Sequence, residues 1–213
     1  MKVKQFMTTD VVAVSENTSL HDAEKIMKAH GIRRLPVMRK DKLVGLVTER
    51  MLVEASASSA KPLTIHELQY LLAKMTVKDI MVKRPFTVSP ELPAEEAMEL
   101  GQEMGYSGFP VLEDGRLVGV VTESDIVRIM TRVLGVREKG KRIDIRAPKR
   151  FGNMKRIMKI LDEHRTVLLS MMTLPPEEDQ GLWLIVLRLK GENANSVIEE
   201  IKSAGFKVTY VGS

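Results

Sequence analysis

Two side chains of one short motif are suited to binding a phosphorylated sugar. Residues 119–125 read GVVTESD, which places the hydroxyl of Thr122 three positions before the carboxylate of Asp125. A carboxylate can accept both hydroxyl hydrogens of a ribose, and a hydroxyl can donate to a phosphate oxygen. The same Thr-x-x-Asp spacing is typical of a helix cap. Because a helix N-terminus also attracts phosphate, the two interpretations are compatible and both stay open.

The motif belongs to a gapless internal repeat. Met7 matches Met81, and the same offset of 74 residues relates many later apolar, glycine and proline positions. The matched pairs include Gly31 and Gly105, Pro36 and Pro110, Gly45 and Gly119, and Thr48 and Thr122. One offset held over so many positions predicts two structural copies of the same unit.

Each copy is predicted to contain a short extended run, a helix, two strands joined by a turn, and a second helix. In the first copy Ser19 is expected to cap a helix that Gly31 ends, and in the second copy a helix opens near Pro93 and ends at Gly105. The expected strands are 35–38 and 43–48 in the first copy, and 109–112 and 117–122 in the second. Both strand pairs are predicted to be hairpins.

This unit, with its Gly-hydrophobic-hydrophobic-Thr-x-x-Asp ending, resembles the CBS domain, and the tandem resembles a CBS pair (Bateman module) over residues 2 to about 131. The resemblance implies a mixed α/β (α+β) fold and a regulatory, energy-sensing role without catalysis. It implies an adenosine-containing nucleotide (AMP, ADP or ATP) or S-adenosylmethionine as the ligand in the cleft of the pair, with no required cofactor and a homodimer as the assembly.

The resemblance also assigns the binding residues of the second copy. Asp125 would hold the ribose and Thr122 the phosphate. The adenine would lie against the backbone of Thr87 and Val88 and the apolar wall of Tyr106, Phe109 and Pro110.

The first copy departs from the pattern, because Met51 stands where the motif has its aspartate. Its site is therefore expected to be weak, altered or empty. Arg33, Arg34, Thr48 and Arg50 are nevertheless expected as nucleotide contacts, mainly to phosphate. The alternative for the arginines is a solvated charged cluster, which is the commoner fate of paired surface arginines.

The C-terminal part is predicted to follow the order β-α-β-β-α-β, which is the ferredoxin-like arrangement. The expected elements are a strand at 143–145, a helix through Met154 to Leu161, strands at 166–174 and 182–189, a helix capped by Asn193, and a closing strand at 206–211. Following a CBS pair, the segment resembles an ACT domain, which implies a small-molecule or amino-acid effector and a regulated partner protein. The loop 146–152 lacks the Asp-x-Pro-Gly run that such domains often carry.

The whole chain is similar to acetoin-utilisation proteins of the CBS plus ACT type. Its expected division is CBS domain 1 at 1–60, an inter-CBS helix at 61–75, CBS domain 2 at 76–134, a basic linker at 135–141, and an ACT-like domain at 142–213. The inter-CBS helix is expected to open with a capping box formed by Thr64 and Glu67.

Composition narrows the remaining function classes. The chain has no cysteine and four scattered histidines, so no metal site or thiol nucleophile is expected. No apolar run approaches the about 18 residues that span a bilayer, which predicts a cytoplasmic protein without a membrane partner. The net charge of +5 leaves one alternative, a nucleic-acid-binding regulator that uses the basic stretch 132–156. That stretch lacks interleaved aromatic residues, so nucleic acid is the less favoured partner.

Overall fold

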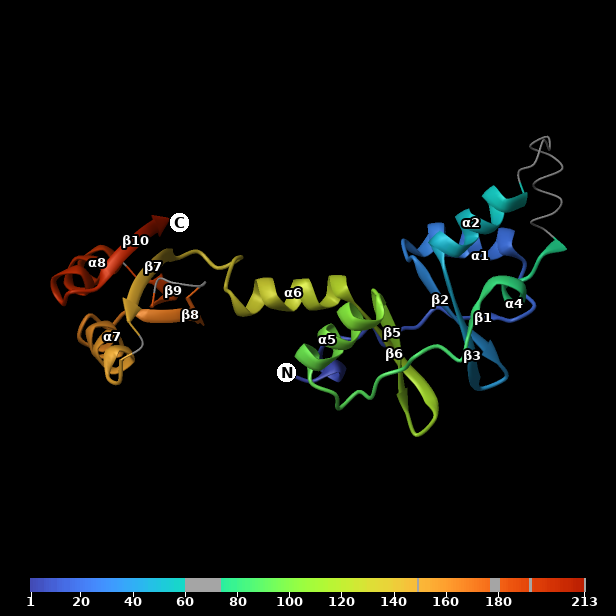
Figure 1. The fold of residues 1–213 in the computed structure, drawn as a ribbon, viewed down its shortest axis with the longest axis horizontal. Coiled ribbons are helices and arrows are strands. Elements are labelled where there is room, and N and C mark those ends of the chain that lie inside the picture. The colour runs from blue at the N-terminus through green and yellow to red at the C-terminus, as the bar shows by residue number, and fades with distance from the viewer. Residues whose placement is uncertain (60–73, 149, 177–180, 192, 213) are drawn as a thin grey trace. The chain divides into compact units, whose positions relative to one another are not determined.

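The computed structural model describes residues 1–59, 74–148, 150–176, 181–191 and 193–212 (Figure 1). The chain forms two compact units, Met1–Ile126 and Val127–Ser213. The capping box and most of the helix expected at 61–75 lie outside the described residues. Among the helices described, none combines the length and the apolar character needed to cross a bilayer.

The first repeat follows the predicted element order. It contains β1 (Val14–Ser15), α1 (Leu20–His30), β2 (Arg34–Arg39), β3 (Lys42–Thr48) and α2 (Glu49–Ser59). The Ser19 hydroxyl accepts a hydrogen bond from the backbone N–H of Asp22 at 3.0 Å, and Gly31 ends α1 with φ of 62°. Only glycine adopts such a left-handed backbone without strain, so the predicted start and end of this helix are confirmed.

The second repeat has the same arrangement. It contains α4 (Val77–Ile80), β4 (Val82–Lys83), α5 (Ala94–Met104), β5 (Gly108–Glu113), β6 (Arg116–Thr122) and α6 (Glu123–Val133). The hairpin β5–β6 pairs Phe109 with Val121, as β2–β3 pairs Leu35 with Val47, and both hairpins shift register at the same step. The two predicted hairpins are therefore confirmed, including their equivalence.

The short segment at the start of each repeat packs on the other repeat. Residues around the 3-10 helix η1 (Val3–Gln5) lie on the second copy, where Thr8 pairs with Val120. In the same way β4, at the start of the second copy, completes the sheet β1-β2-β3-β4 of the first. We call residues 1–8 and 76–83 the leader segments. Because Thr8 lies on the second repeat and β1 on the first, the chain between them crosses from one repeat to the other.

A glycine in each repeat makes room for this exchange. A Cβ atom at Gly119 would lie 2.6 Å from Met7 Sδ, and a Cβ at Gly45 would overlap the sulfur of Met81. Met7 of the first leader segment therefore contacts Gly119, and Met81 of the second contacts Gly45, so the matched residues make equivalent contacts with the opposite repeat. Side-chain-free backbone at these two positions is what lets the leader approach β3 and β6.

A double ion pair fixes the first leader segment. Lys2 Nζ and Lys4 Nζ lie 2.6 Å and 2.5 Å from the two carboxylate oxygens of Glu91. The hydrogen bonds from Lys2 and Lys4 lower the pKa of Glu91 from 4.5 to about 2. Because the folded-state pKa lies below the ordinary value, this stabilisation is present above pH 4.5 and is lost as the pH falls toward 2.

Replacing Glu91 with glutamine is expected to lower the unfolding midpoint slightly at pH 7 and to remove part of the acid sensitivity between pH 4.5 and 2. The effect is small because all three side chains are about half exposed and screened by solvent. Thermal unfolding of the wild type, Glu91→Gln and the control Glu96→Gln over this pH range measures it. A constant separation between the wild-type and Glu91→Gln curves down to pH 2 would contradict the ion-pair account.

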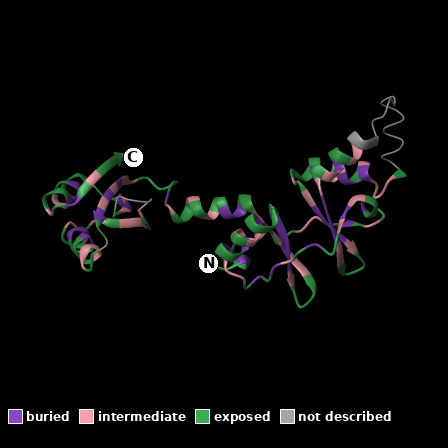
Figure 2. Cartoon of the chain, in the orientation of Figure 1, coloured by how far each residue is buried: buried purple, intermediate pink, exposed green. Residues whose placement is uncertain are grey.

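The second unit consists of β7 (Lys141–Pro148), α7 (Asn153–Glu163), β8 (Val167–Leu174), β9 (Leu182–Lys190), α8 (Ala194–Ser203) and β10 (Lys207–Gly212). The predicted β-α-β-β-α-β order is confirmed, and the antiparallel sheet has the strand order β10-β7-β9-β8. Burial alternates along β7 (Figure 2), and Ile143 and Ile145 are fully buried with Ile157 of α7 and Ile201 of α8. The helices therefore cover one face of the sheet.

Two details of this unit differ from the sequence prediction. Asn193 occupies the N-cap position of α8 but makes no capping hydrogen bond with its side chain, whose Nδ2 lies 3.3 Å from the carbonyl oxygen of His164. Strand β7 begins at Lys141, which was expected to end the basic linker. The pairing of Lys141 with Leu189 and of Arg142 with Arg188 extends the strand two residues before the apolar pattern, which starts at Ile143.

Candidate functional site

Asp125 is the centre of the site, at the start of α6. The backbone N–H and the hydroxyl of Thr122 donate to Asp125 Oδ2 at 2.9 Å and 2.7 Å, and the N–H of Asp125 lies 3.3 Å from Thr122 Oγ1. These bonds form a capping box, so the capping interpretation of the motif is confirmed.

Capping alone does not explain the burial of Asp125. Its side chain is 6% exposed and is the one buried polar or charged side chain among the residues that the structure describes. Asp79 makes the same capping box with Thr76, at 2.8 Å and 2.9 Å, yet it is exposed to solvent. Burying a carboxylate is costly unless it has polar partners. Asp125 therefore differs from Asp79 in its burial, which the cap alone does not require.

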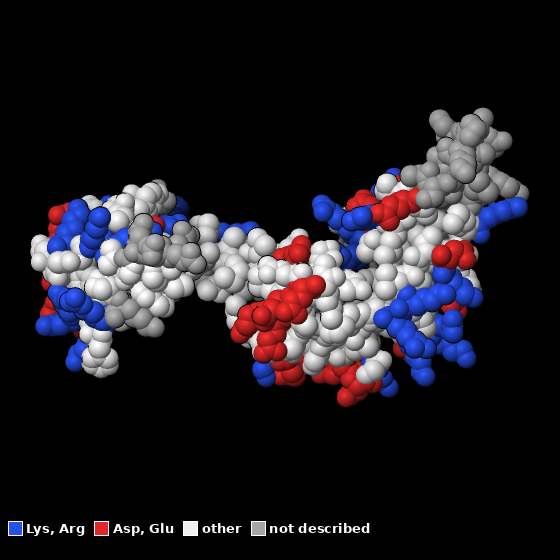
Figure 3. Space-filling view, in the orientation of Figure 1, with Lys and Arg blue, Asp and Glu red and all other residues white. Residues whose placement is uncertain are grey.

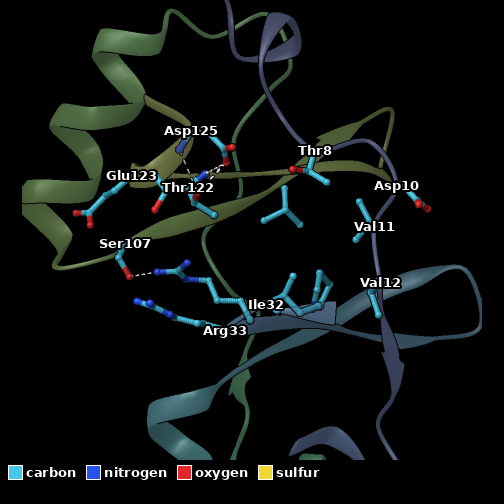
Figure 4. Close-up of a pocket in the computed structure, with 15 residues that line it drawn as sticks. Thr8, Asp10, Val11, Val12, Ile32, Arg33, Ser107, Thr122, Glu123 and Asp125 are labelled. Atoms are coloured by element: carbon cyan, nitrogen blue, oxygen red, sulfur yellow. Dashed lines mark hydrogen bonds between the residues drawn. The ribbon is translucent and has the colours of Figure 1, made fainter. Parts of the chain in front are cut away.

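A cavity of about 600 Å³ lies against Asp125 (Figure 4). We call it the first cavity. Three segments line it, namely residues 8–12, residues 31–36 and the β6–α6 junction, together with Ser107 before β5. Its volume is within the range of about 300 to 1,000 Å³ that small-molecule sites occupy. The site is therefore built by both repeats together.

The two sides of the first cavity differ in chemistry. Thr122 and Asp125 lie on the side of the second repeat, and Val11, Val12 and Ile32 lie across from them on the side of the first (Figure 4). Pro36 continues the apolar side. An apolar slot facing a carboxylate and a hydroxyl can take a flat base on one side and a sugar on the other.

Arg34 and Arg33 add positive charge to this cavity. The guanidinium of Arg34 donates to the Ser107 hydroxyl, which joins the two repeats. Burial lowers the pKa of the Arg34 guanidinium, while Glu123 opposes that shift. Arg33 is mostly exposed, and its Nε lies 4.0 Å from Glu49 Oε2. Both arginines can reach an anion because both line the cavity.

The structure brings together some of the predicted site residues and separates others. Thr122, Asp125, Arg33 and Arg34 line the first cavity. The predicted adenine contacts at Thr87, Val88, Phe109 and Pro110 do not line it, and Val88 and Phe109 are instead 5% and 3% exposed in the core.

The base wall that the sequence predicted within the second repeat therefore does not coincide with the lining of the first cavity. The leader exchange places residues of the first repeat opposite Asp125, and their contribution was missed from sequence. The missed lining residues include Thr8, Asp10, Val11, Val12, Ile32 and Pro36. The internal repeat could have indicated two of these lining residues, because Ile32 and Pro36 are the first-copy counterparts of Tyr106 and Pro110.

A second cavity of about 470 Å³ surrounds the equivalent position of the first repeat. Thr48, Arg50 and Met51 line it together with Tyr106 of the other repeat. The N–H of Met51 lies 3.4 Å from Thr48 Oγ1, so half of the capping box is present without a carboxylate. Arg50 Nε lies 2.7 Å from Glu54 Oε1.

Within the described ranges, no group of three or more metal-ligating side chains is placed to hold a metal ion.

The CBS domain family model matches residues 3–58 and 77–132, more than half of the chain. The chain therefore belongs to the CBS-domain family, and it contains two such domains in tandem. A curated relative is an inosine-5′-monophosphate dehydrogenase from Korarchaeum cryptofilum, 36% identical over 126 residues. The match covers 59% of this chain and 23% of that enzyme's length.

Three solved structures are similar to the CBS pair. One is a CBS domain pair in complex with 5′-methylthioadenosine and S-adenosyl-L-methionine, with a TM-score of 0.53, 28% identity and coverage of 61% of this chain and 95% of that one. Another is CBSX2 in complex with AMP, with a TM-score of 0.51, 27% identity and coverage of 62% and 97%. The third, from Vibrio cholerae, is named for acetoin utilization, with a TM-score of 0.54, 27% identity and coverage of 65% and 96%.

Proposed function

We propose that the chain is a non-catalytic regulatory sensor that binds one adenosine-containing nucleotide, or S-adenosylmethionine, in the first cavity. The observation that carries this proposal is the buried carboxylate of Asp125 facing an apolar wall across a cavity of about 600 Å³. The adenosine ligands of two similar CBS-pair structures support the ligand class.

Each part of such a ligand has a matching surface. Asp125 accepts the ribose hydroxyls, and Val11, Val12 and Ile32 hold the base. The phosphates or the charged tail lie toward Thr122, the N-terminus of α6, and Arg33 and Arg34. This assignment keeps the predicted roles of Thr122 and Asp125 and moves the base to the first repeat.

The second unit completes the proposed sensor. Its β-α-β-β-α-β order is the ferredoxin-like arrangement, which supports our proposal of an ACT-type domain that binds a small-molecule or amino-acid effector. Ligand binding regulates a partner protein only if the chain adopts two conformations that bind the ligand with different affinities. A homodimer is the assembly that we expect, and the similarity to the Vibrio cholerae protein supports a role of the acetoin-utilisation type.

One observation favours the nucleic-acid alternative. Residues 127–213 contain 17 Lys and Arg against 10 Asp and Glu, whereas acidic side chains gather over α5 in the first unit (Figure 3). Phosphate backbones are attracted to such a basic unit in a salt-dependent way. A steeply salt-dependent gel shift with short duplex DNA would promote this alternative over an effector-binding role of the second unit.

A thermal-shift screen tests the proposed function. AMP, ADP, ATP, S-adenosylmethionine and the common amino acids are added in turn to the full chain. At least one adenosine compound is expected to raise the unfolding midpoint, because a ligand at 100 times its Kd stabilises by about 2.7 kcal/mol. If no adenosine compound raised the midpoint at millimolar concentration, the proposed function would be wrong.

A further inference from the structure

The second cavity has no role in the proposed function, yet it shares residues with the first. Arg33, Arg34 and Ser107 line both cavities. Both cavities lie within the compact unit Met1–Ile126, so this sharing is a property of one folded body. The two arginines therefore stand between two possible binding sites.

Acidic side chains act on these arginines from both sides. On the first-cavity side, Glu123 and Asp125 raise the pKa of Arg34 against the effect of its burial. On the second-cavity side, Glu49 Oε2 lies 4.0 Å from Arg33 Nε. The Arg33–Glu49 ion pair is therefore a long one, and Arg34 donates to the Ser107 hydroxyl. An anion entering one cavity can therefore attract them away from the other.

The lining of the second cavity indicates an anion that lacks a nucleoside. Met51 replaces the carboxylate that would accept ribose hydroxyls, and its thioether is only a weak acceptor. Arg50 stands where the second repeat has Ser124, which adds a third guanidinium to the shared pair. Arginine groups bind phosphate oxygens in bidentate fashion, and Glu49 and Glu54 offset only part of this charge.

We propose that the second cavity binds a small condensed phosphate without a nucleoside, and that this anion and the nucleotide of the first cavity compete for Arg33 and Arg34. Each ligand then weakens the other by the same factor, because coupling between two binding sites is reciprocal. The competition rests on the proposed function, since it requires a phosphorylated ligand in the first cavity. The anion site itself does not.

The coupling is tested by titrating the full chain with AMP, with and without inorganic pyrophosphate, at matched ionic strength. Pyrophosphate is expected to raise the apparent Kd of AMP about tenfold. Adenosine, which has no phosphate, is expected to bind equally with and without pyrophosphate. In Arg50→Gln the effect on AMP is expected to disappear, because Arg50 lines the second cavity and not the first.

Arg50 is 87% exposed, so its replacement is not expected to impair folding. An equal pyrophosphate effect in the wild type and Arg50→Gln would show direct competition in the first cavity and would overturn the inference, as would no effect at all.

Direct titration of pyrophosphate into Asp125→Ala separates this inference from the proposed function. Binding there that is lost in the Asp125→Ala, Arg50→Gln double variant would support the anion site even if no nucleotide bound the wild type. Absence of pyrophosphate binding in Asp125→Ala would reject the anion site while leaving nucleotide binding intact.

Discussion

Replacing Asp125 with alanine is expected to weaken the binding of AMP, or of the preferred adenosine compound, by about 100-fold. The carboxylate is the acceptor proposed for both ribose hydroxyls, and two charge-assisted hydrogen bonds are together worth about 3 kcal/mol. Its burial against the apolar side of the cavity removes competing water and strengthens those bonds. Calorimetric titration of the wild type and the variant measures the change.

The chain offers a matched control for the loss of the helix cap. Asp79 accepts the same two hydrogen bonds from Thr76 as Asp125 accepts from Thr122, but it does not line either cavity. Asp79→Ala is expected to lower the unfolding midpoint by a few degrees, as Asp125→Ala does, since loss of a cap costs about 1 kcal/mol. It is expected to leave nucleotide affinity unchanged. Equal losses of affinity in both variants would mean that Asp125 acts only through folding.

Replacing Met51 with aspartate is expected to raise the nucleotide stoichiometry from one to two per chain. The half capping box at Thr48 already positions residue 51 as Thr122 positions Asp125, and Met51 lines a cavity of about 470 Å³. The new carboxylate supplies the missing ribose acceptor and completes the cap, which adds about 0.5 to 1 kcal/mol of stability. The second site is expected to be the weaker one, because both draw on Arg33 and Arg34.

Met51→Leu is the control for this variant, since it preserves volume and apolar character without adding an acceptor. It is expected to keep a stoichiometry of one. If Met51→Asp bound only one nucleotide per chain at saturation, the proposed role of the motif's carboxylate in ribose binding would be contradicted.

The local elements could be predicted because their signals lie within a few residues. The Ser19 cap and the left-handed glycines at Gly31 and Gly105 set the ends of the helices, and pairs of apolar runs around a turn predicted the hairpins. The capping box at Thr122 and Asp125 was also readable, because its hydrogen bonds span three residues. For this motif, only the burial of the Asp125 side chain could not be predicted from the sequence.

The proposed base wall could not be predicted from the sequence because it depends on a long-range exchange. The pairing of Thr8 with Val120 and of Val82 with Leu46 decides which repeat faces Asp125, and no local pattern encodes it. The contact of Arg34 with Ser107 joins residues 73 positions apart for the same reason. The repeat did mark Met7 and Gly119, but their mutual contact became visible only in the fold.

The central claim is one adenosine-compound site per chain, with its carboxylate from the second repeat and its base wall from the first. The most direct test is calorimetric titration of the full chain and of Asp125→Ala with AMP, ADP, ATP and S-adenosylmethionine. We predict that at least one compound binds the wild type with a stoichiometry of one and binds Asp125→Ala about 100-fold more weakly. No binding by any of the four, or equal binding to both proteins, would contradict the account.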